Sequence, residues 1–185
     1  MSSSIVVPRR DLVLGGARSG KTGVALARAE ASGLAPVMVA TAEAHDAEMS
    51  ARIAAHRAER GAHWGLVEEP RDLAGAIGRE SGPSRILVID CLTLWLTNTL
   101  FGDGDVEEAI EGLVAAFAAA AGPVVAVSNE VGLSIVPDNA LARRFRDLQG
   151  LLNRRFAAVA DRVTLVVAGI GVPIKGEGAI GRPAS

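Results

Sequence analysis

The sequence predicts a three-layer α/β domain, in which a mostly parallel sheet is flanked by helices. Three observations support this fold class. Strand-like and helix-like segments alternate along the chain, the strand-like segments are hydrophobic over nearly their whole length, and a phosphate-binding motif follows the first strand-like segment. The alternation is typical of βαβ units. Continuous hydrophobicity indicates strands covered on both faces, so helices are expected on each side of the sheet.

The expected strands are short runs of β-branched and aliphatic residues. They are residues 11–14, 36–41, 86–90, 124–128 and 163–168, with 63–68 as a weaker sixth. The clearest helix is expected over 139–160, because apolar residues recur there at spacings of three and four and form one stripe. The stripe comprises Leu141, Phe145, Leu148, Leu152, Phe156 and Val159. Asn139 is a suitable N-cap for this helix, and a further helix is expected over 46–60.

Length and charge exclude several classes of protein. The 185 residues suffice for one domain with its own core. A net charge of −2 gives no broad cationic field, which argues against nucleic-acid or membrane partners. The one cysteine, Cys91, cannot form an internal disulfide, and this fits a reducing compartment. The longest apolar stretch, 113–127, is interrupted by Gly122 and Pro123 and is too short to span a membrane. We therefore expect a soluble, cytoplasmic protein.

A glycine-rich motif follows the first expected strand. In the pattern G-x-x-x-x-G-K-[ST], glycines let backbone N–H groups surround a phosphate, and the N-terminus of the next helix adds positive potential. The lysine and threonine reach the β- and γ-phosphates and Mg²⁺. The residues that match are Gly15, Gly16, Ala17, Arg18, Ser19, Gly20, Lys21 and Thr22. The motif predicts a single P-loop (RecA-like) nucleotide-binding domain over residues 1–185, with about 176–185 as a flexible tail.

A P-loop requires a carboxylate at the end of another strand to orient Mg²⁺. Asp90 ends the hydrophobic run 86–90, so Thr22 and Asp90 are the candidate metal ligands. Asp90 can equally begin a turn or cap the next helix. The P-loop leaves kinases, ATPases, GTPases and nucleotide sensors open. Residues 128–131, Ser-Asn-Glu-Val, do not match the N-K-x-D guanine-binding motif of switch GTPases.

One histidine lies in a cationic stretch that is expected to be helical. Arg52 and Arg60 stand four residues before and after His56, so the three share one helix face. Such a face can bind a triphosphate, and its charge favours a neutral imidazole with a nucleophilic nitrogen. Solvated arginines around a surface histidine give the same spacing. The spacing of His45 and His63 to His56 does not match a metal-binding motif such as H-E-x-x-H.

Further motifs are spread over the chain up to Lys175. They are Ala40-Thr41-Ala42, Glu48-Met49, Arg52-Ile53, His56, Trp64, Glu68, Thr97-Asn98, Asn129-Glu130-Val131-Gly132, Ile135-Val136-Pro137, Asn139, Leu141-Ala142-Arg143, Phe145-Arg146-Asp147 and Gly169-Ile170-Gly171. With this combination the sequence as a whole resembles the bifunctional adenosylcobinamide kinase and adenosylcobinamide-phosphate guanylyltransferase family of cobalamin synthesis. A generic P-loop protein shares the first motif and little else.

The resemblance implies an enzyme with two steps at one nucleotide-binding region. In the first step, ATP or GTP phosphorylates the aminopropanol hydroxyl of adenosylcobinamide. In the second, GTP transfers GMP to an enzyme histidine, which by motif position is His56. Adenosylcobinamide phosphate then accepts the GMP to give adenosylcobinamide-GDP. The resemblance also implies Mg²⁺ as cofactor and a homotrimer as the assembly.

The resemblance extends to individual site residues. His56 and Lys21 are the implied catalytic residues. The implied nucleotide-binding residues are Gly15 to Thr22, Ala40, Thr41, Ala42, Arg57, Ala58, Glu59, Arg60, Glu68 and Asp90. Family members often carry glutamate at the position of Asp90, so this chain keeps the carboxylate with a shorter reach. Two alternatives stay open: a P-loop small-molecule kinase without the guanylyltransferase step, and a non-enzymatic GTP sensor.

Overall fold

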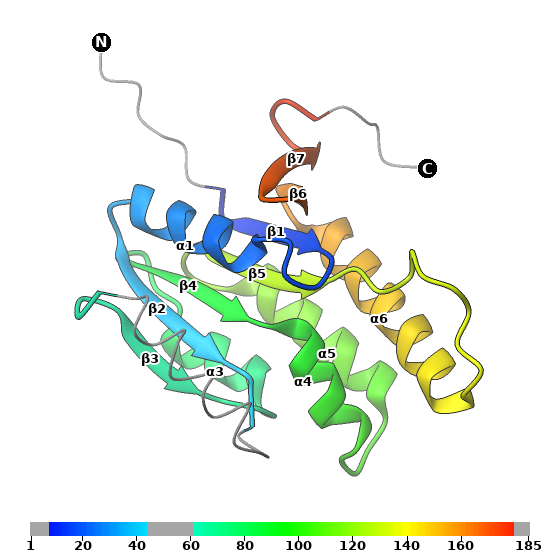
Figure 1. The fold of residues 1–185 in the computed structure, drawn as a ribbon. Coiled ribbons are helices and arrows are strands. Elements are labelled where there is room, and N and C mark those ends of the chain that lie inside the picture. Colours follow the sequence, from blue (N-terminus) through cyan, green and yellow to red (C-terminus); the bar gives the residue numbers. More distant parts are fainter. Residues whose placement is uncertain (1–7, 44–60, 180–185) are drawn as a thin grey trace.

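The computed structural model describes residues 8–43 and 61–179, and its centre is a seven-stranded sheet (Figure 1). The strands lie in the order β3-β2-β4-β5-β1-β6-β7. Strands β1 to β6 pair in parallel, whereas β7 runs antiparallel to β6. The strands are β1 Arg10–Gly15, β2 Ala35–Ala40, β3 Gly65–Glu68, β4 Arg85–Asp90, β5 Val124–Asn129, β6 Arg162–Val167 and β7 Ile170–Lys175. The mostly parallel sheet is confirmed.

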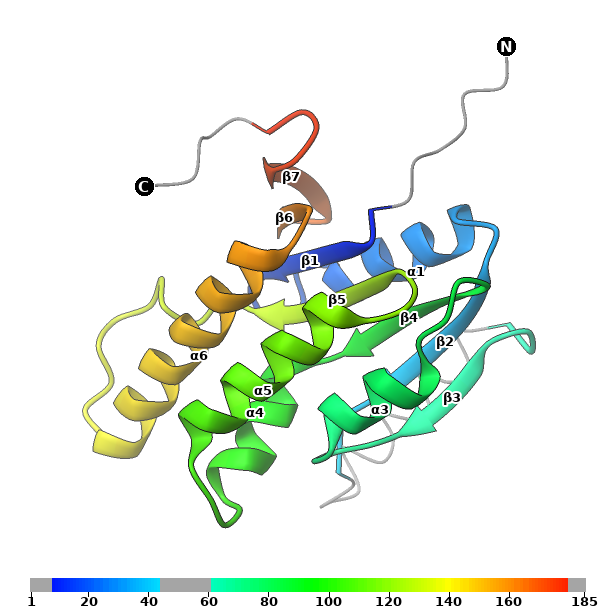
Figure 2. The ribbon, with the colours of Figure 1, turned by 180° about the vertical axis from the view of Figure 1, so that it is seen from behind.

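Helices cover both faces of the sheet, as the continuous hydrophobicity of the strands predicts. The helices are α1 Lys21–Ala31, α3 Leu73–Glu80, α4 Leu92–Leu100, α5 Val106–Ala119 and α6 Ala140–Val159. Helix α1 packs on one face (Figure 1), and α3 to α6 lie together on the other (Figure 2). None of these helices is both long enough and apolar enough to cross a membrane. The helix expected over 46–60 lies outside the described residues.

The core has a separate apolar cluster on each face, because successive side chains of a strand point to opposite sides. On the α1 side, Val13, Val88 and Val127 pack with Ala25 and Ala29 of the helix. The other cluster is larger and contains residues of all four helices on that face. Its members include Leu12, Leu87, Ile89, Ile77, Leu96, Phe117, Leu152 and Phe156. Burial on both sides leaves little room for polar positions in the central strands.

The longest helix follows its prediction closely but not at the ends of its apolar stripe. Asn139 caps α6, since its side chain accepts hydrogen bonds from the N–H groups of the next turn. Leu148, Leu152 and Phe156 are buried and Phe145 is half-buried, whereas Leu141 and Val159 are 45% and 37% exposed. At the other end of the helix, Lys175 Nζ donates to the carbonyls of Ala157 and Ala158 at 2.8 and 2.9 Å. One of the chain's two lysines therefore stabilises a helix terminus.

The last strand, β7, was not expected from the sequence. It carries Gly171 and Pro173, and its residues are exposed or only half-buried. Ala168 and Gly169, both with positive φ, form the tight turn that leads into it. A half-exposed edge strand with glycine and proline lacks the apolar run by which the other six strands were identified. The weaker prediction over 63–68 is confirmed in part, because β3 begins at Gly65.

Candidate active site

Three central strands end at one edge of the sheet, which we call the carboxyl edge. Gly15 ends β1, Asn129 ends the neighbouring β5, and Asp90 ends β4 beyond it. Gly15 pairs with Asn129 in the register of the sheet. Helix α1 begins at the same edge, directly after the glycine-rich loop of residues 15–20. In parallel α/β sheets, this is the edge at which ligands bind.

Close packing requires glycine at two positions of the phosphate-binding loop. A Cβ at Gly15 would lie 2.5 Å from Ser19 Oγ and 2.6 Å from the carbonyl oxygen of Val166. Gly20 is the N-cap residue of α1 and has φ 94°, in the left-handed region that favours glycine. A Cβ there would lie 3.3 Å from Cα of Gly169. The glycines of the motif thus allow the loop to turn closely against the end of β6.

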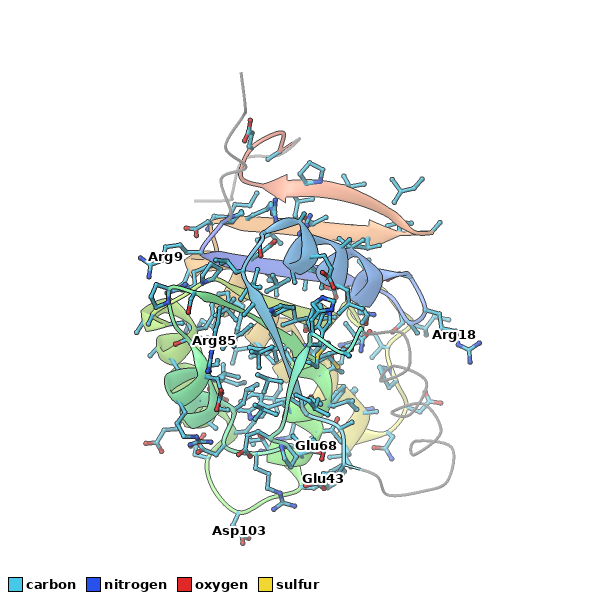
Figure 3. All side chains as sticks on the ribbon, turned by 90° about the vertical axis from the view of Figure 1, so that its left-hand side faces the viewer. Arg9, Arg18, Glu43, Glu68, Arg85 and Asp103 are labelled. Atoms are coloured by element: carbon cyan, nitrogen blue, oxygen red, sulfur yellow. The ribbon has the colours of Figure 1, made fainter. Side chains whose placement is uncertain are left out.

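Backbone hydrogen bonds from two other segments hold the loop. Glu130 N–H donates to the carbonyl of Gly15 at 3.0 Å, and Gly169 N–H donates to that of Ser19 at 2.9 Å. The Ser19 hydroxyl is buried without a hydrogen-bond partner in the described part of the chain. Arg18 projects outward from the loop (Figure 3). The loop is therefore fixed from behind, and its outer side, with Arg18, faces solvent.

Lys21, Thr22 and Asp90 meet beside this loop. Lys21 is buried, and its Nζ donates to the carbonyl of Gly16 at 2.8 Å, so the ammonium group lies against the loop. Thr22 Oγ1 donates to Asp90 Oδ2 at 3.4 Å. Cys91, not Asp90, is the N-cap residue of α4. The Asp90 carboxylate thus contacts the first turn of α1, which agrees with its predicted place in a nucleotide site.

The hydroxyl of Thr22 and the carboxylate of Asp90 form a donor set that fits Mg²⁺. Mg²⁺ prefers oxygen ligands and is usually held by one or two protein groups together with phosphate oxygens and water. Their 3.4 Å separation lets one ion contact both oxygens. The two predicted metal ligands therefore meet in space, although they come from different elements of the fold.

The segment 40–42 lies one strand beyond Asp90. Thr41 is fully buried, and its hydroxyl accepts from the N–H of Cys91 at 2.8 Å and donates to the carbonyl of Cys91 at 2.7 Å. Its side chain therefore joins β2 to the start of α4. Its neighbours Ala40 and Ala42 are half-buried.

Burial raises the pKa of the Cys91 thiol to about 11, and the charge of Asp90 adds to this shift.

Glu68, another predicted site residue, is not beside the loop. Glu68 ends the edge strand β3, four strand spacings from β1, a distance on the order of 19 Å. Figure 3 shows it well separated from Arg18. His56 and the predicted nucleotide-binding residues Arg57, Ala58, Glu59 and Arg60 lie outside the described residues, as do His45 and Arg52. The structure therefore brings the P-loop and Asp90 together, whereas the role of His56 rests on the sequence alone.

Comparison with known proteins decides the family. The model of the cobinamide kinase / cobinamide phosphate guanyltransferase family matches residues 11–174. The chain belongs to this family. It is 48% identical to the bifunctional adenosylcobalamin biosynthesis protein CobP of Pseudomonas aeruginosa, over 91% of this chain and 98% of that one. It is 43% identical to CobU of Salmonella typhimurium, over 89% and 98%.

The comparison also confirms the fold and the class of enzyme. The RadB recombinase matches with a TM-score of 0.52 at 16% identity, over 86% of this chain and 74% of that one. At that identity the likeness concerns the P-loop RecA-like fold alone. The family model and the curated relatives identify this cobinamide kinase family member as a transferase of cobalamin biosynthesis.

This cobinamide kinase family member also has a buried polar network at the end of β5, which was not expected from the sequence. Ser128 Oγ donates to Asn153 Oδ1 at 2.6 Å, and Gln149 Nε2 donates to both groups at 3.0 Å. Asn153 Nδ2 donates to the carbonyl of Asn129 at 3.0 Å. The only signal in the sequence was a pair of amides four residues apart in α6. Without the strand order, that pair is typical of a solvated helix face.

An apolar cavity of about 650 Å³ adjoins the same edge of the sheet. It lies between the end of α4, the segment after β5 and the start of α6. Its lining includes Leu100, Phe101, Val131, Pro137, Leu141 and Phe145, with Thr97, Ser134, Asn139 and Arg146 as polar members. Val131 follows Glu130, whose N–H bonds to the phosphate loop. One lining residue of the cavity is therefore next in sequence to a residue whose backbone bonds to the phosphate loop.

Proposed function

We propose that the chain catalyses two consecutive reactions. It phosphorylates adenosylcobinamide with ATP or GTP, and it then transfers GMP from GTP, through a GMP–His56 intermediate, to adenosylcobinamide phosphate. The observation that carries this proposal is the contact of Thr22 with Asp90 beside a complete P-loop, in a chain that matches the bifunctional family over residues 11–174. The proposal includes a homotrimer in the cytoplasm, as the family resemblance implies.

In the kinase step, the substrate hydroxyl attacks the γ-phosphorus and the bond from this phosphorus to the bridging oxygen breaks. The nucleoside diphosphate leaves, and the hydroxyl proton is released. Lys21 and the loop N–H groups stabilise the charge on the transferred phosphoryl group. Thr22 and Asp90 would hold Mg²⁺, and the bound ion would neutralise part of the phosphate charge. The apolar cavity beside Val131 offers a surface for the large acceptor.

In the guanylyltransferase step, a neutral nitrogen of His56 attacks the α-phosphorus of GTP. The bond to the β-phosphate oxygen breaks, so pyrophosphate leaves and a phosphorus–nitrogen bond forms. A phosphate oxygen of adenosylcobinamide phosphate then attacks the same phosphorus, and the bond to His56 breaks. The covalent intermediate divides one difficult displacement into two easier ones. The arginines at 52, 57 and 60 supply positive charge close to His56 in sequence.

The test is formation of the covalent intermediate. The full chain is incubated with Mg²⁺ and GTP labelled at the α-phosphate, and acid-labile, alkali-stable label on the protein is measured. The wild type and His45→Ala are expected to carry label, whereas His56→Ala carries none and retains kinase activity. An unlabelled wild type with kinase activity contradicts the transferase step. An unlabelled wild type that binds GTP without turnover identifies a sensor, and label on His56→Ala moves the nucleophile to another residue.

A second measurement tests the assembly. Light scattering coupled to size-exclusion chromatography gives the mass of the particle in solution, and three times the 19.0 kDa chain mass is expected. A mass equal to one chain at micromolar concentration contradicts the proposed homotrimer.

A further inference from the structure

We propose that Asn129 contacts the terminal phosphate of the bound nucleotide, and that helices α4 and α6 hold it there. Its side-chain amide donates a hydrogen bond from Nδ2 to an oxygen of that phosphate. The inference rests on the proposed function, because the nucleotide is the substrate of both steps. Four features of the described residues carry it.

The first feature is the place of Asn129 in the sheet. It ends β5, the strand between β1, which leads into the phosphate loop, and β4, which ends at Asp90. Asn129 pairs with Gly15, and Val127 pairs with Asp90. Asn129 is therefore next to the first residue of the loop and two positions beyond the level of Asp90. A phosphate held between the loop and Asp90 would lie across the end of β5.

The second feature is the face to which the side chain points. Val125 and Val127 of β5 belong to the core on the α1 side, whereas Ser128 bonds to Asn153 of α6 on the opposite side. Because successive side chains of a strand alternate, that of Asn129 points to the α1 side. This is the side on which Asp90 contacts Thr22 at the start of α1. The side chain is thus on the same side of the sheet as the two candidate metal ligands.

The third feature is the support of the Asn129 backbone. Its N–H donates to Thr93 Oγ1 at 2.9 Å, and its carbonyl accepts from Asn153 Nδ2 at 3.0 Å. The next N–H, that of Glu130, donates to the carbonyl of Gly15 at 3.0 Å. Side chains from two helices therefore hold the backbone of Asn129, and the phosphate loop holds that of the next residue. Such support is what a group needs in order to meet a phosphate at a set distance.

The fourth feature is a contrast between the buried polar side chains around Asn129 and the side chain of Asn129 itself. Gln149 and Ser128 are fully buried and Asn153 is 5% exposed, and Gln149 Oε1 has no partner within the described chain. Apolar side chains would fill this space without an unpaired acceptor. The half-buried carboxamide of Asn129 itself makes no hydrogen bond among the described residues. It is an oriented donor without an internal acceptor.

The experiment compares triphosphate with diphosphate binding in the full-length protein. The dissociation constants of a Mg²⁺-bound, non-hydrolysable GTP analogue and of GDP are measured by calorimetry. Asn129→Ala is expected to weaken the analogue about tenfold and GDP less than twofold, which corresponds to one hydrogen bond to a charged group. Asn129→Asp keeps the shape but replaces the donor by a charge, so it should weaken the analogue at least as much. An unchanged ratio of the two constants in Asn129→Ala, or wild-type affinity in Asn129→Asp, overturns the proposal.

The positioning role has its own test. Thr93→Val removes the acceptor for Asn129 N–H and keeps the side-chain shape, so a threefold to fivefold loss of analogue affinity is expected. Thr99→Val is the matched control, because the Thr99 hydroxyl donates to the carbonyl of Trp95 within its own helix α4. Adding Thr93→Val to Asn129→Ala should cause no further loss, since Thr93 acts through Asn129. Additive losses overturn the positioning role.

These binding ratios do not depend on turnover. Kinase assays of the same variants give a second reading, in which Asn129→Ala lowers kcat/KM at least tenfold without a matching fall in Tm. Failure of the proposed function appears instead as absence of phosphorylated adenosylcobinamide with the wild type. The two failures are therefore distinguishable.

Discussion

The two ends of the parallel sheet hold their polar groups in opposite ways. At the amino end, Asp11 is 1% exposed and accepts hydrogen bonds from Arg28 at 2.9 Å and Arg162 at 3.0 Å. Arg28 also donates to Thr164 at 2.7 Å. The charges of Asp11, Arg28 and Arg162 are thus paired with one another inside the fold. At the carboxyl edge, the Ser19 hydroxyl is buried without a partner in the described chain, and the loop keeps an exposed outer side.

This difference indicates that the amino end of the sheet serves stability, whereas the carboxyl edge serves binding and catalysis. A buried polar group that is satisfied internally has nothing left to offer a ligand, whereas an oriented group without an internal partner gains by meeting one. Arg9 and Arg85 mark the amino end in Figure 3, and Arg18 marks the carboxyl edge. Substitutions at the first end should change the free energy of unfolding. Substitutions at the second should change binding and catalysis.

The largest change in stability is expected for Asp11→Ala. It leaves the guanidinium groups of Arg28 and Arg162, which are 21% and 28% exposed, without their common partner. The free energy of unfolding should fall by about 3–5 kcal/mol, as measured by urea denaturation. Glu111→Ala, which breaks the exposed pair with Arg155, is the control and should cost at most about 1 kcal/mol. An equal effect of both substitutions would falsify the distinction.

Lys21→Ala should lower activity strongly and stability little, the reverse of the result expected for Asp11→Ala. The ammonium group lies against the phosphate loop, so its loss removes charge stabilisation from both proposed transfer steps. Both rates should fall about 100- to 1000-fold. The free energy of unfolding should change by no more than about 1 kcal/mol. A large loss of stability with intact rates would reverse the roles assigned to the two ends.

Features of the fold and the site could be predicted from the sequence where they depend on residues that are close together along the chain. The P-loop is a contiguous motif, and apolar runs reveal six of the seven strands, although the edge strand β3 is largely exposed and was found only in part. Asp90 was found because it ends such a run. The support of Asn129 was missed, because Thr93 and Asn153 meet it only through the order of strands. Likewise Leu141 appeared to be a core residue, since its spacing carried no information on where neighbouring elements end.

The next effect concerns the Cys91 thiol beside Asp90. Its pKa is raised from 9.0 to about 11, so at pH 8 its thiolate fraction is about a hundredfold lower than that of an exposed thiol. Alkylation by iodoacetamide should be at least that much slower in the native protein than in urea. The folded state also binds this proton more tightly, so the free energy of unfolding should fall as pH rises from 9 to 11. Cys91→Ala should remove that part of the pH dependence.

The smallest effect is expected for Lys175→Met. Val163 at the start of β6 pairs with Lys175, so this lysine belongs to the amino end of the sheet. Its ammonium group stabilises the last carbonyls of α6, and its loss should cost about 0.3–1 kcal/mol in unfolding free energy. Thermal denaturation measures the loss, and kinase activity at 25 °C should be unchanged. A fall in kcat would mean that this lysine also serves the carboxyl edge.

The position of β1 between β5 and β6 has a consequence for synthesis of the chain. Asp11 and Arg162, which meet across the β1–β6 pair, are 151 residues apart in sequence. The strand that carries the phosphate loop therefore leaves the ribosome long before either of its neighbours exists. Until β5 and β6 are made, a hydrophobic strand has both edges open, and contacts of such long range close slowly. A nascent chain stalled before residue 162 should bind chaperones rather than nucleotide.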